Sequence, residues 1–293
     1  MRNTQLLPRL AVLAGISIIV IAILSFMGNN PLHSLIPKGM PEVASVKTYY
    51  EPESLCTLIH LRQIHSVSRV EPTVEGKNQL DRVQREIYTI ALSLKTNAGL
   101  QDFYAEGVTE ANLPEIMMSI ERRKEVDAFA KQAGEFHKVA KEIGALAHML
   151  EAGLGRTSRP PARLEVTNAA PEKSDEGLTY IKLVVEGGMT LRPAESEETE
   201  VRSARAIQTA FTDVLTKKDL SAIERIKDDP RVTVDRENEL LRLLAKDHAN
   251  GVLTNGTALA IYGGLHDFEK RVRNWNKTNH LKFSLITVTP RSY

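Results

Sequence analysis

Residues 54–61, SLCTLIHL, are a compact apolar run without a helical period, which predicts a buried β-strand. Residues 76–97 follow with apolar side chains at helical spacing, which predicts an amphipathic helix. Residues 100–105, LQDFYA, predict a second strand. Strand, helix and strand in this order form a βαβ unit, so the two strands are expected to be parallel.

The rest of the chain continues this alternation. We expect further helices over residues 121–151, 197–217, 236–250 and 267–276, and further strands over 257–262 and 283–288. Residues 178–193 are expected to be extended, with the glycine pair at 187–188 as a turn. These elements predict an α/β fold with a mainly parallel sheet flanked by helices. The active crevice of such a sheet lies at the C-terminal ends of its strands.

The composition is that of a globular protein. The chain has 293 residues, of which 42% are hydrophobic and 26% charged, so it can bury a core. Lys plus Arg number 38 and Asp plus Glu 37, which argues against a nucleic-acid-binding surface. The single cysteine, Cys56, excludes an intramolecular disulfide and a cysteine-rich zinc module. We interpret it as a small core residue.

The N-terminal region contains a candidate membrane span. Residues 10–27, LAVLAGISIIVIAILSFM, carry no charge. As a helix they would span roughly 27 Å, close to the bilayer core of about 30 Å. Arg2 and Arg9 precede them, so the positive-inside rule places the N-terminus in the cytoplasm. We therefore expect one transmembrane helix, an uncleaved signal anchor in the cytoplasmic membrane; a cleaved signal peptide and a buried core helix are the alternatives.

Three regions of the chain follow from this. Residues 1–28 are predicted as the anchor, 29–50 as a linker, and 51–293 as an extracytoplasmic α/β domain. Within that domain, residues 157–177 are rich in Pro, Ala, Ser and charge, and are predicted to be a mobile surface insertion.

Polar residues follow three of the predicted strands, at the point where each strand ends. Arg62 and His65 follow the first strand, Glu106 follows the second, and His266 with Asp267 follows a later one. The C-terminal ends of parallel strands share one edge of a sheet, so these residues form a candidate site. The glycine pair at 263–264 would let backbone or ligand approach closely.

The chemistry of this candidate site has two readings. Two imidazoles and a carboxylate, from His65, Glu106 and His266, could hold a divalent metal ion with an open position. Without a metal, His65 or His266 would act as a general base, with Glu106 orienting or activating it. In either case Arg62 would bind a substrate carboxylate, phosphate or oxyanion. Asp267 is expected to cap the helix that follows and to contribute to substrate binding.

Four segments resemble one protein family. GGLHDF, residues 263–268, resembles the second Gly-x-x-His motif of the TraB/Tiki and erythromycin-esterase/ChaN-like superfamily. FYAEG, residues 103–107, resembles its acidic strand-end motif, and IHLRQIH, residues 59–65, lies where it carries its first histidine motif, although Arg62 stands where the family has glycine. LRPAES, residues 191–196, resembles an acidic element of uncharacterised members, which adds Glu195 to the substrate-binding residues.

This resemblance implies an α/β core with His65, Glu106 and His266 in the catalytic or metal-binding role. Members of the superfamily include metal-dependent peptidases, esterases that open macrolide lactones, and haem- or iron-binding lipoproteins. We therefore expect a membrane-anchored extracytoplasmic hydrolase-like protein, a peptidase or esterase that acts on a small-molecule or peptide substrate, with a divalent metal ion as the candidate cofactor. The alternative is a non-catalytic protein that binds haem, a metal or an envelope partner.

Overall fold

The computed structural model describes residues 32, 35–64, 74–153, 178–219 and 221–293. The predicted anchor at 1–28 and the predicted insertion at 157–177 lie outside these residues, and so does His65. Within the described ranges, none of the helices combines the length and the apolar character that crossing a bilayer requires.

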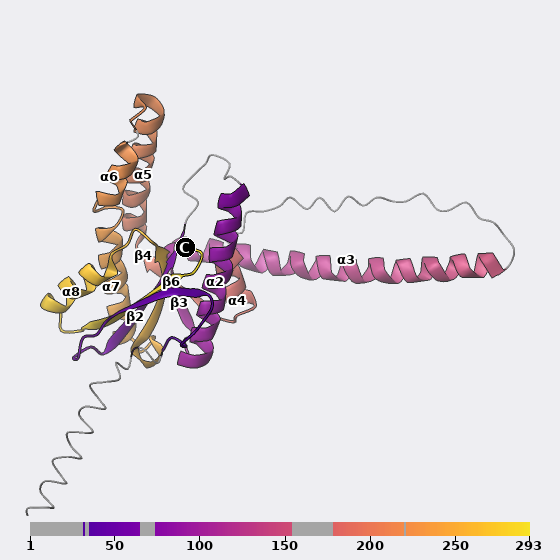
Figure 1. Ribbon diagram of the computed structural model, residues 1–293, viewed down its shortest axis with the longest axis horizontal. Coiled ribbons are helices and arrows are strands. Elements are labelled where there is room, and N and C mark those ends of the chain that lie inside the picture. Colours follow the sequence, from indigo (N-terminus) through magenta and orange to yellow (C-terminus); the bar gives the residue numbers. More distant parts are fainter. Residues whose placement is uncertain (1–31, 33–34, 65–73, 154–177, 220) are drawn as a thin grey trace, which may run out of the picture.

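One sheet stands at the centre of the described structure (Figure 1). Its strands are β1 (Val43–Tyr49), β2 (Cys56–Gln63), β3 (Asp102–Thr109), β4 (Thr190–Glu195), β5 (Thr257–Gly263) and β6 (Phe283–Pro290). They lie in the order β1-β6-β2-β5-β3-β4. β1 is antiparallel to β6, and all the other neighbouring strands are parallel. The predicted α/β fold with a mainly parallel sheet is therefore confirmed.

The helices of the described structure are α2 (Val74–Ala98), α3 (Leu113–Gly153), α4 (Leu178–Val185), α5 (Glu197–Lys217), α6 (Ser221–Asp228), α7 (Val234–Ala249) and α8 (Phe268–Thr278), with a short 3-10 turn at Thr254–Gly256. Helices pack on both faces of the sheet, α2 and α4 on one and α7 and α8 on the other. Successive strand residues point to opposite faces. Accordingly, Ile59 and Leu61 of β2 pack in one core with α2 and α4, whereas Leu58 packs in a second core with α7 and α8.

The predicted linker over residues 29–50 is wrong in its second half. Residues 43–49 form β1, an edge strand whose register with β6 runs from Val43 opposite Pro290 to Tyr49 opposite Leu285. Leu32 and Ile36 are also buried in the core. Three prolines suggested a linker, and β1 gives a weak strand signal because an edge strand keeps much of its surface in solvent.

The extended segment predicted over residues 178–193 is also partly wrong. Residues 178–185 form α4, and the strand begins at Thr190. LTYIKLVV is short, apolar and rich in β-branched residues, so its periodicity does not separate a strand from a buried helix. Packing decides it: Leu183 is fully buried, and the Thr179 hydroxyl donates to the Gln84 carbonyl of α2 over 3.1 Å.

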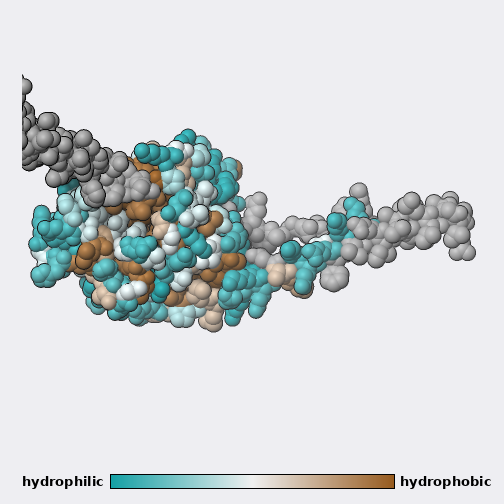
Figure 2. Space-filling view, turned by 90° about the horizontal axis from the view of Figure 1, so that it is seen from below, coloured by the Kyte–Doolittle hydropathy of each residue, from teal (hydrophilic) through white to brown (hydrophobic). Residues whose placement is uncertain are grey.

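α3 leaves the body of the molecule and extends well beyond the sheet (Figures 1 and 2). The helix predicted over residues 121–151 is thus confirmed, and it begins earlier than expected, at Leu113.

Candidate functional site

The C-terminal ends of β3, β4 and β5 bring three of the predicted site residues together. Glu106 lies near the end of β3, Glu195 is the last residue of β4, and His266 follows β5 by three residues. Their side chains are 10%, 0% and 3% exposed. The shared edge of parallel strands is the reason for this meeting, as the sequence predicted for Glu106 and His266, whereas Glu195 was expected there only from the family resemblance.

Arg236 of α7 lies between two of these residues, and the sequence analysis did not single it out. Its Nε and Nη2 donate to the two oxygens of Glu195 over 2.8 and 2.5 Å, and its Nη1 donates to Glu106 Oε1 over 2.6 Å. Burial opposes the charge of the guanidinium, but the nearby carboxylates of Glu106 and Glu195 outweigh it and raise the pKa of Arg236. Arg236 shares a helix face with Leu240, so an arginine within an apolar stripe was the available signal.

His266 is held between two carboxylates. Its Nδ1 lies 3.2 Å from Glu237 Oε1, and its Nε2 lies 3.4 Å from Glu106 Oε1. Burial favours the neutral ring, but the hydrogen bonds to Glu106 and Glu237 prevail and raise the pKa of His266 to about 9. His266 is therefore an imidazolium at neutral pH, with both ring nitrogens acting as donors.

The two sets of contacts form one continuous group. Glu237 accepts the Asp267 backbone N–H over 2.8 Å, and its other oxygen lies 3.3 Å from Arg271 Nε. We call these residues the charge cluster: Glu106, Glu195, Arg236, Glu237, His266 and Arg271. Three carboxylates are balanced by two guanidinium groups and one imidazolium, which is what burial of so many charges requires.

Backbone groups complete the coordination of the carboxylates. Glu106 Oε2 accepts the Gly263 N–H over 2.6 Å, and Glu195 Oε1 accepts the Gly107 N–H over 2.8 Å. Gly107 has a φ of +79°, a conformation that favours glycine. The charge cluster is therefore tied to the ends of β3 and β5 as well as to α7.

Arg62, predicted to bind a substrate anion, lies at the same edge but outside the charge cluster. Its Nη2 donates to the Gly264 carbonyl over 2.7 Å, and its guanidinium lies 4.4 Å from the centre of the Tyr293 ring. A Cβ on Gly264 would fall 1.1 Å from the Tyr293 hydroxyl oxygen. The group that approaches this glycine closely is therefore a side chain of the same protein.

Glu86 of α2 holds the segment that carries Tyr293. Its two carboxylate oxygens accept the backbone N–H and the hydroxyl of Ser292 over 2.8 and 2.7 Å. Asp267 caps α8 as predicted, accepting the Lys270 N–H over 3.2 Å. Its part in substrate binding, like that of Arg62 and Glu195, stays a prediction.

A second histidine lies beneath the site on β2. His60 is buried, and its Nε2 has no hydrogen-bond partner among the described residues. Its ring packs against Phe268, with ring centres 4.8 Å apart. Burial lowers the pKa of His60 to about 3, and the nearby charge of His266 acts in the same direction, so the ring stays neutral.

The described part of the site does not fit a metal ion. Both oxygens of Glu106 already accept hydrogen bonds, and both nitrogens of the His266 ring already lie within 3.4 Å of a carboxylate oxygen. The Arg236 guanidinium, in contact with Glu106, would repel a cation. Across the described ranges, His, Cys, Asp and Glu side chains nowhere gather in a group of three or more that could hold a metal ion.

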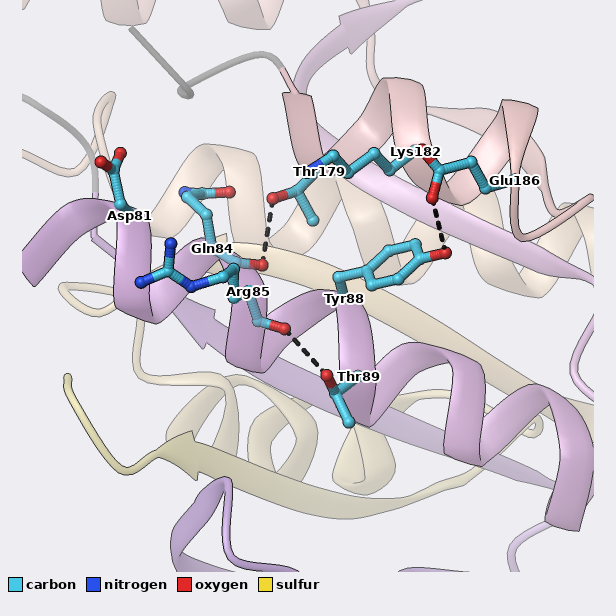
Figure 3. A pocket seen from close by; sticks show the side chains of 8 residues that line it. All are labelled: Asp81, Gln84, Arg85, Tyr88, Thr89, Thr179, Lys182 and Glu186. Atoms are coloured by element: carbon cyan, nitrogen blue, oxygen red, sulfur yellow. Dashed lines mark hydrogen bonds between the residues drawn. The ribbon is translucent and has the colours of Figure 1, made fainter. Parts of the chain in front are cut away.

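A separate pocket of about 250 Å³ lies between α2 and α4 (Figure 3). Its lining is polar and of mixed charge, and it includes Asp81, Arg85, Tyr88, Lys182 and Glu186. The Tyr88 hydroxyl donates to Glu186 over 3.2 Å across it. Among the predicted site residues that the structure describes, none lines this pocket, and no member of the charge cluster does either.

Comparisons of the chain with protein-family models, with curated proteins and with solved structures found no match. The resemblance to the TraB/Tiki and erythromycin-esterase/ChaN-like superfamily therefore stays a prediction based on four short motifs.

Proposed function

We propose that this chain is a hydrolase-like enzyme that works without a metal ion and uses Glu106 and His266 in acid–base chemistry. The observation that carries the proposal is the 3.4 Å contact between His266 Nε2 and Glu106 Oε1 in a nearly buried site at the strand ends. An imidazolium with a pKa of about 9 is suited to donate a proton to a departing alkoxide or amine. Glu237, 3.2 Å from Nδ1, orients the ring, and Glu106 holds the Nε2 proton until the leaving group replaces it as the acceptor.

The attacking water requires a base as well. His65 is our candidate, because it follows β2, whose C-terminal end lies beside that of β5. In the proposed reaction water attacks the carbonyl carbon of an ester, lactone or amide and gives a proton to His65. The bond to the leaving group then breaks, and the leaving group takes a proton from His266. Arg62 would bind a negatively charged part of the substrate.

The proposed setting is the cytoplasmic membrane, with the α/β domain on its extracytoplasmic side. The support is the uncharged run at residues 10–27 with Arg2 and Arg9 before it. A small-molecule or peptide substrate and attachment to the membrane through this segment are parts of the same proposal.

The test is an assay of the purified chain on panels of carboxylic esters, lactones and peptides. We expect Glu106→Gln and His266→Gln to lower kcat/KM by about 100-fold or more. His280→Gln is the matched control because His280 is exposed and outside the site. Thermal melting of each variant separates loss of chemistry from loss of folding. Full activity in a folded His266→Gln variant, or inactivity of the parent chain on all three panels, would overturn the proposal.

The low exposure of the charge cluster favours a second candidate, a non-catalytic binding protein. Glu195 is 0% exposed and Glu237 2% exposed, so these buried carboxylates already pair with cationic groups of the same cluster. In that case the parent chain would be inactive on every substrate class. Haem binding would appear as a Soret band on titration, and its absence would remove haem as the ligand.

A further inference from the structure

The segment that follows β6 crosses the edge of the sheet at which the candidate site lies. β6, β2 and β5 are parallel neighbours, so their C-terminal ends share this edge. From the end of β6, Tyr293 reaches over Arg62 of β2 to Gly264, which follows β5. Gly263, the residue before Gly264, donates its N–H to Glu106 Oε2 over 2.6 Å. The Tyr293 ring therefore lies beside the charge cluster.

The surroundings of the Tyr293 ring are those that an aromatic group prefers. The Arg62 guanidinium lies 4.4 Å from the ring centre, where a cation is attracted to the ring electrons, and its Nη2 is fixed by a 2.7 Å hydrogen bond to the Gly264 carbonyl. A Cβ on Gly264 would fall 1.1 Å from the Tyr293 hydroxyl oxygen, so only glycine admits the ring here. The next residue, Leu265, is 55% exposed and adds apolar surface to the same loop.

The backbone of this segment is held firmly, whereas the Tyr293 ring is not. Ser292 is bound to α2 by three hydrogen bonds, two to Glu86 and one of 3.1 Å from Gln79 Nε2 to its carbonyl. Tyr293 donates its backbone N–H to the Pro290 carbonyl over 3.3 Å, and its hydroxyl has no hydrogen-bond partner among the described residues. One contact between a cation and a ring shifts an equilibrium by about two- to fivefold at a partly exposed position. The ring can therefore be displaced while Ser292 stays in place.

We propose that the space between Arg62 and Gly264 is an aromatic subsite of the candidate site, which Tyr293 fills and from which the aromatic ring of a substrate displaces it. The part of this subsite in catalysis rests on the proposed function, and it narrows the substrate class to esters, lactones or amides that carry an aryl group. A ring bound there would place the rest of the substrate beside His266, two residues along the loop. Arg62 can contact a ring and an anion together, because its N–H donors lie in the plane of the guanidinium.

Titration of the full chain with 4-methylphenol, followed by NMR of the probe, tests the subsite. We expect Tyr293→Ala to bind this probe about tenfold more tightly than the parent, since a subsite that is filled about 90% of the time loses about tenfold in apparent affinity. Tyr293 is only half-buried, so the variant is expected to fold, and thermal melting checks this. Tyr50→Ala is the control and should bind like the parent, because Tyr50 is 46% exposed and follows β1, which ends at the opposite edge of the sheet.

Two further changes in the Tyr293→Ala background locate the bound probe. Gly264→Ala should weaken binding of 4-methylphenol by about tenfold or more, because the added Cβ takes the space of the ring. Arg62→Met should weaken it about threefold by removing the cation, and 4-methylcyclohexanol, which has no aromatic ring, should bind about threefold more weakly than 4-methylphenol.

Three results would overturn the proposal: equal binding by the parent and Tyr293→Ala, binding that survives Gly264→Ala, or equal binding of the two probes. The titration requires no turnover. It therefore decides whether the subsite exists even if the chain is inactive on every ester, lactone and peptide, a result that would overturn the proposed function instead.

Discussion

The Arg236 guanidinium binds the two oxygens of the Glu195 carboxylate through two hydrogen bonds, of 2.8 and 2.5 Å, although α7 and β4 supply these residues from positions 41 apart in the chain. Glu195 is completely buried, and the side chain of Arg236 is 8% exposed. A paired geometry of this kind fixes both groups in direction as well as in distance. The pair thereby positions α7 against the strand ends from which Glu106 also projects.

Removal of Arg236 is expected to be costly. Arg236→Met would leave two buried carboxylates, Glu195 and Glu106, without their cation, and should lower the free energy of unfolding by about 3–5 kcal/mol. Arg242→Met on the same helix is the control, because the exposed pair of Arg242 with Glu239 should contribute less than about 1 kcal/mol. Urea denaturation of both variants measures the difference. Equal losses would show that the charge cluster does not support the fold.

His266 makes stability depend on pH in the alkaline range. The pKa of His266 is raised from 6.5 to about 9, so the folded protein binds a proton that the unfolded chain releases. The resulting stabilisation, of about 3 kcal/mol, is complete below pH 6.5 and is lost as pH rises through about 9. Unfolding measured from pH 6 to 10 should show this decline in the parent and not in His266→Gln. A parent profile as flat as that of the variant would contradict it.

His60 is expected to act in the opposite direction in acid. The pKa of His60 is lowered to about 3, so the unfolded chain binds a proton that the folded protein cannot accept. Its contribution to the free energy of unfolding is present above pH 6.5. It is lost as pH falls, with a slope of up to about 1.4 kcal/mol per pH unit. His60→Leu should flatten the acid side of the stability profile, whereas the exposed His280→Leu should leave it unchanged. Parallel profiles of parent and His60→Leu would be the contrary result.

The contact between Gly264 and Tyr293 can be tested by filling the space between them. Gly264→Ala would place a Cβ on the Tyr293 hydroxyl, so we expect a loss of about 1 kcal/mol or more from overpacking. In a Tyr293→Ala background the same change should cost much less, and a double-mutant cycle measures the difference. Gly134→Ala is the control, because a Cβ there meets open space. Equal costs in the two backgrounds would show that Tyr293 does not cover Gly264.

We expect chelators to have no effect on the stability of the protein. Because Glu106 and His266 are committed to hydrogen bonds, we expect EDTA to leave the melting temperature unchanged. Elemental analysis of the parent chain beside His266→Ala should find no stoichiometric metal in either. A metal present in the parent and lost in His266→Ala would restore the metal-dependent alternative.

Local sequence patterns were sufficient for most of the elements. The helix expected over residues 197–217 has those bounds in the structure, and β5 begins at the predicted residue 257. Both predictions rest on hydrophobic periodicity, which is a property of the segment itself and does not depend on distant parts of the chain. α4 and β1 were missed because their state depends on partners distant in the chain: α4 packs on α2, and β1 pairs with β6.

The candidate site divides in the same way. The sequence by itself determined that Glu106 and His266 would stand at strand ends, since a residue that follows a parallel strand must emerge at one edge of the sheet. Glu195 was expected at the site only from the family resemblance. Tertiary structure alone decided their partners. Arg236 lies 130 residues from Glu106 in the chain and Glu237 lies 29 residues from His266, and α7 brings both into place by packing its leucines on the sheet. Periodicity specifies which face of a helix is buried; the charges that this face meets are fixed when the elements pack.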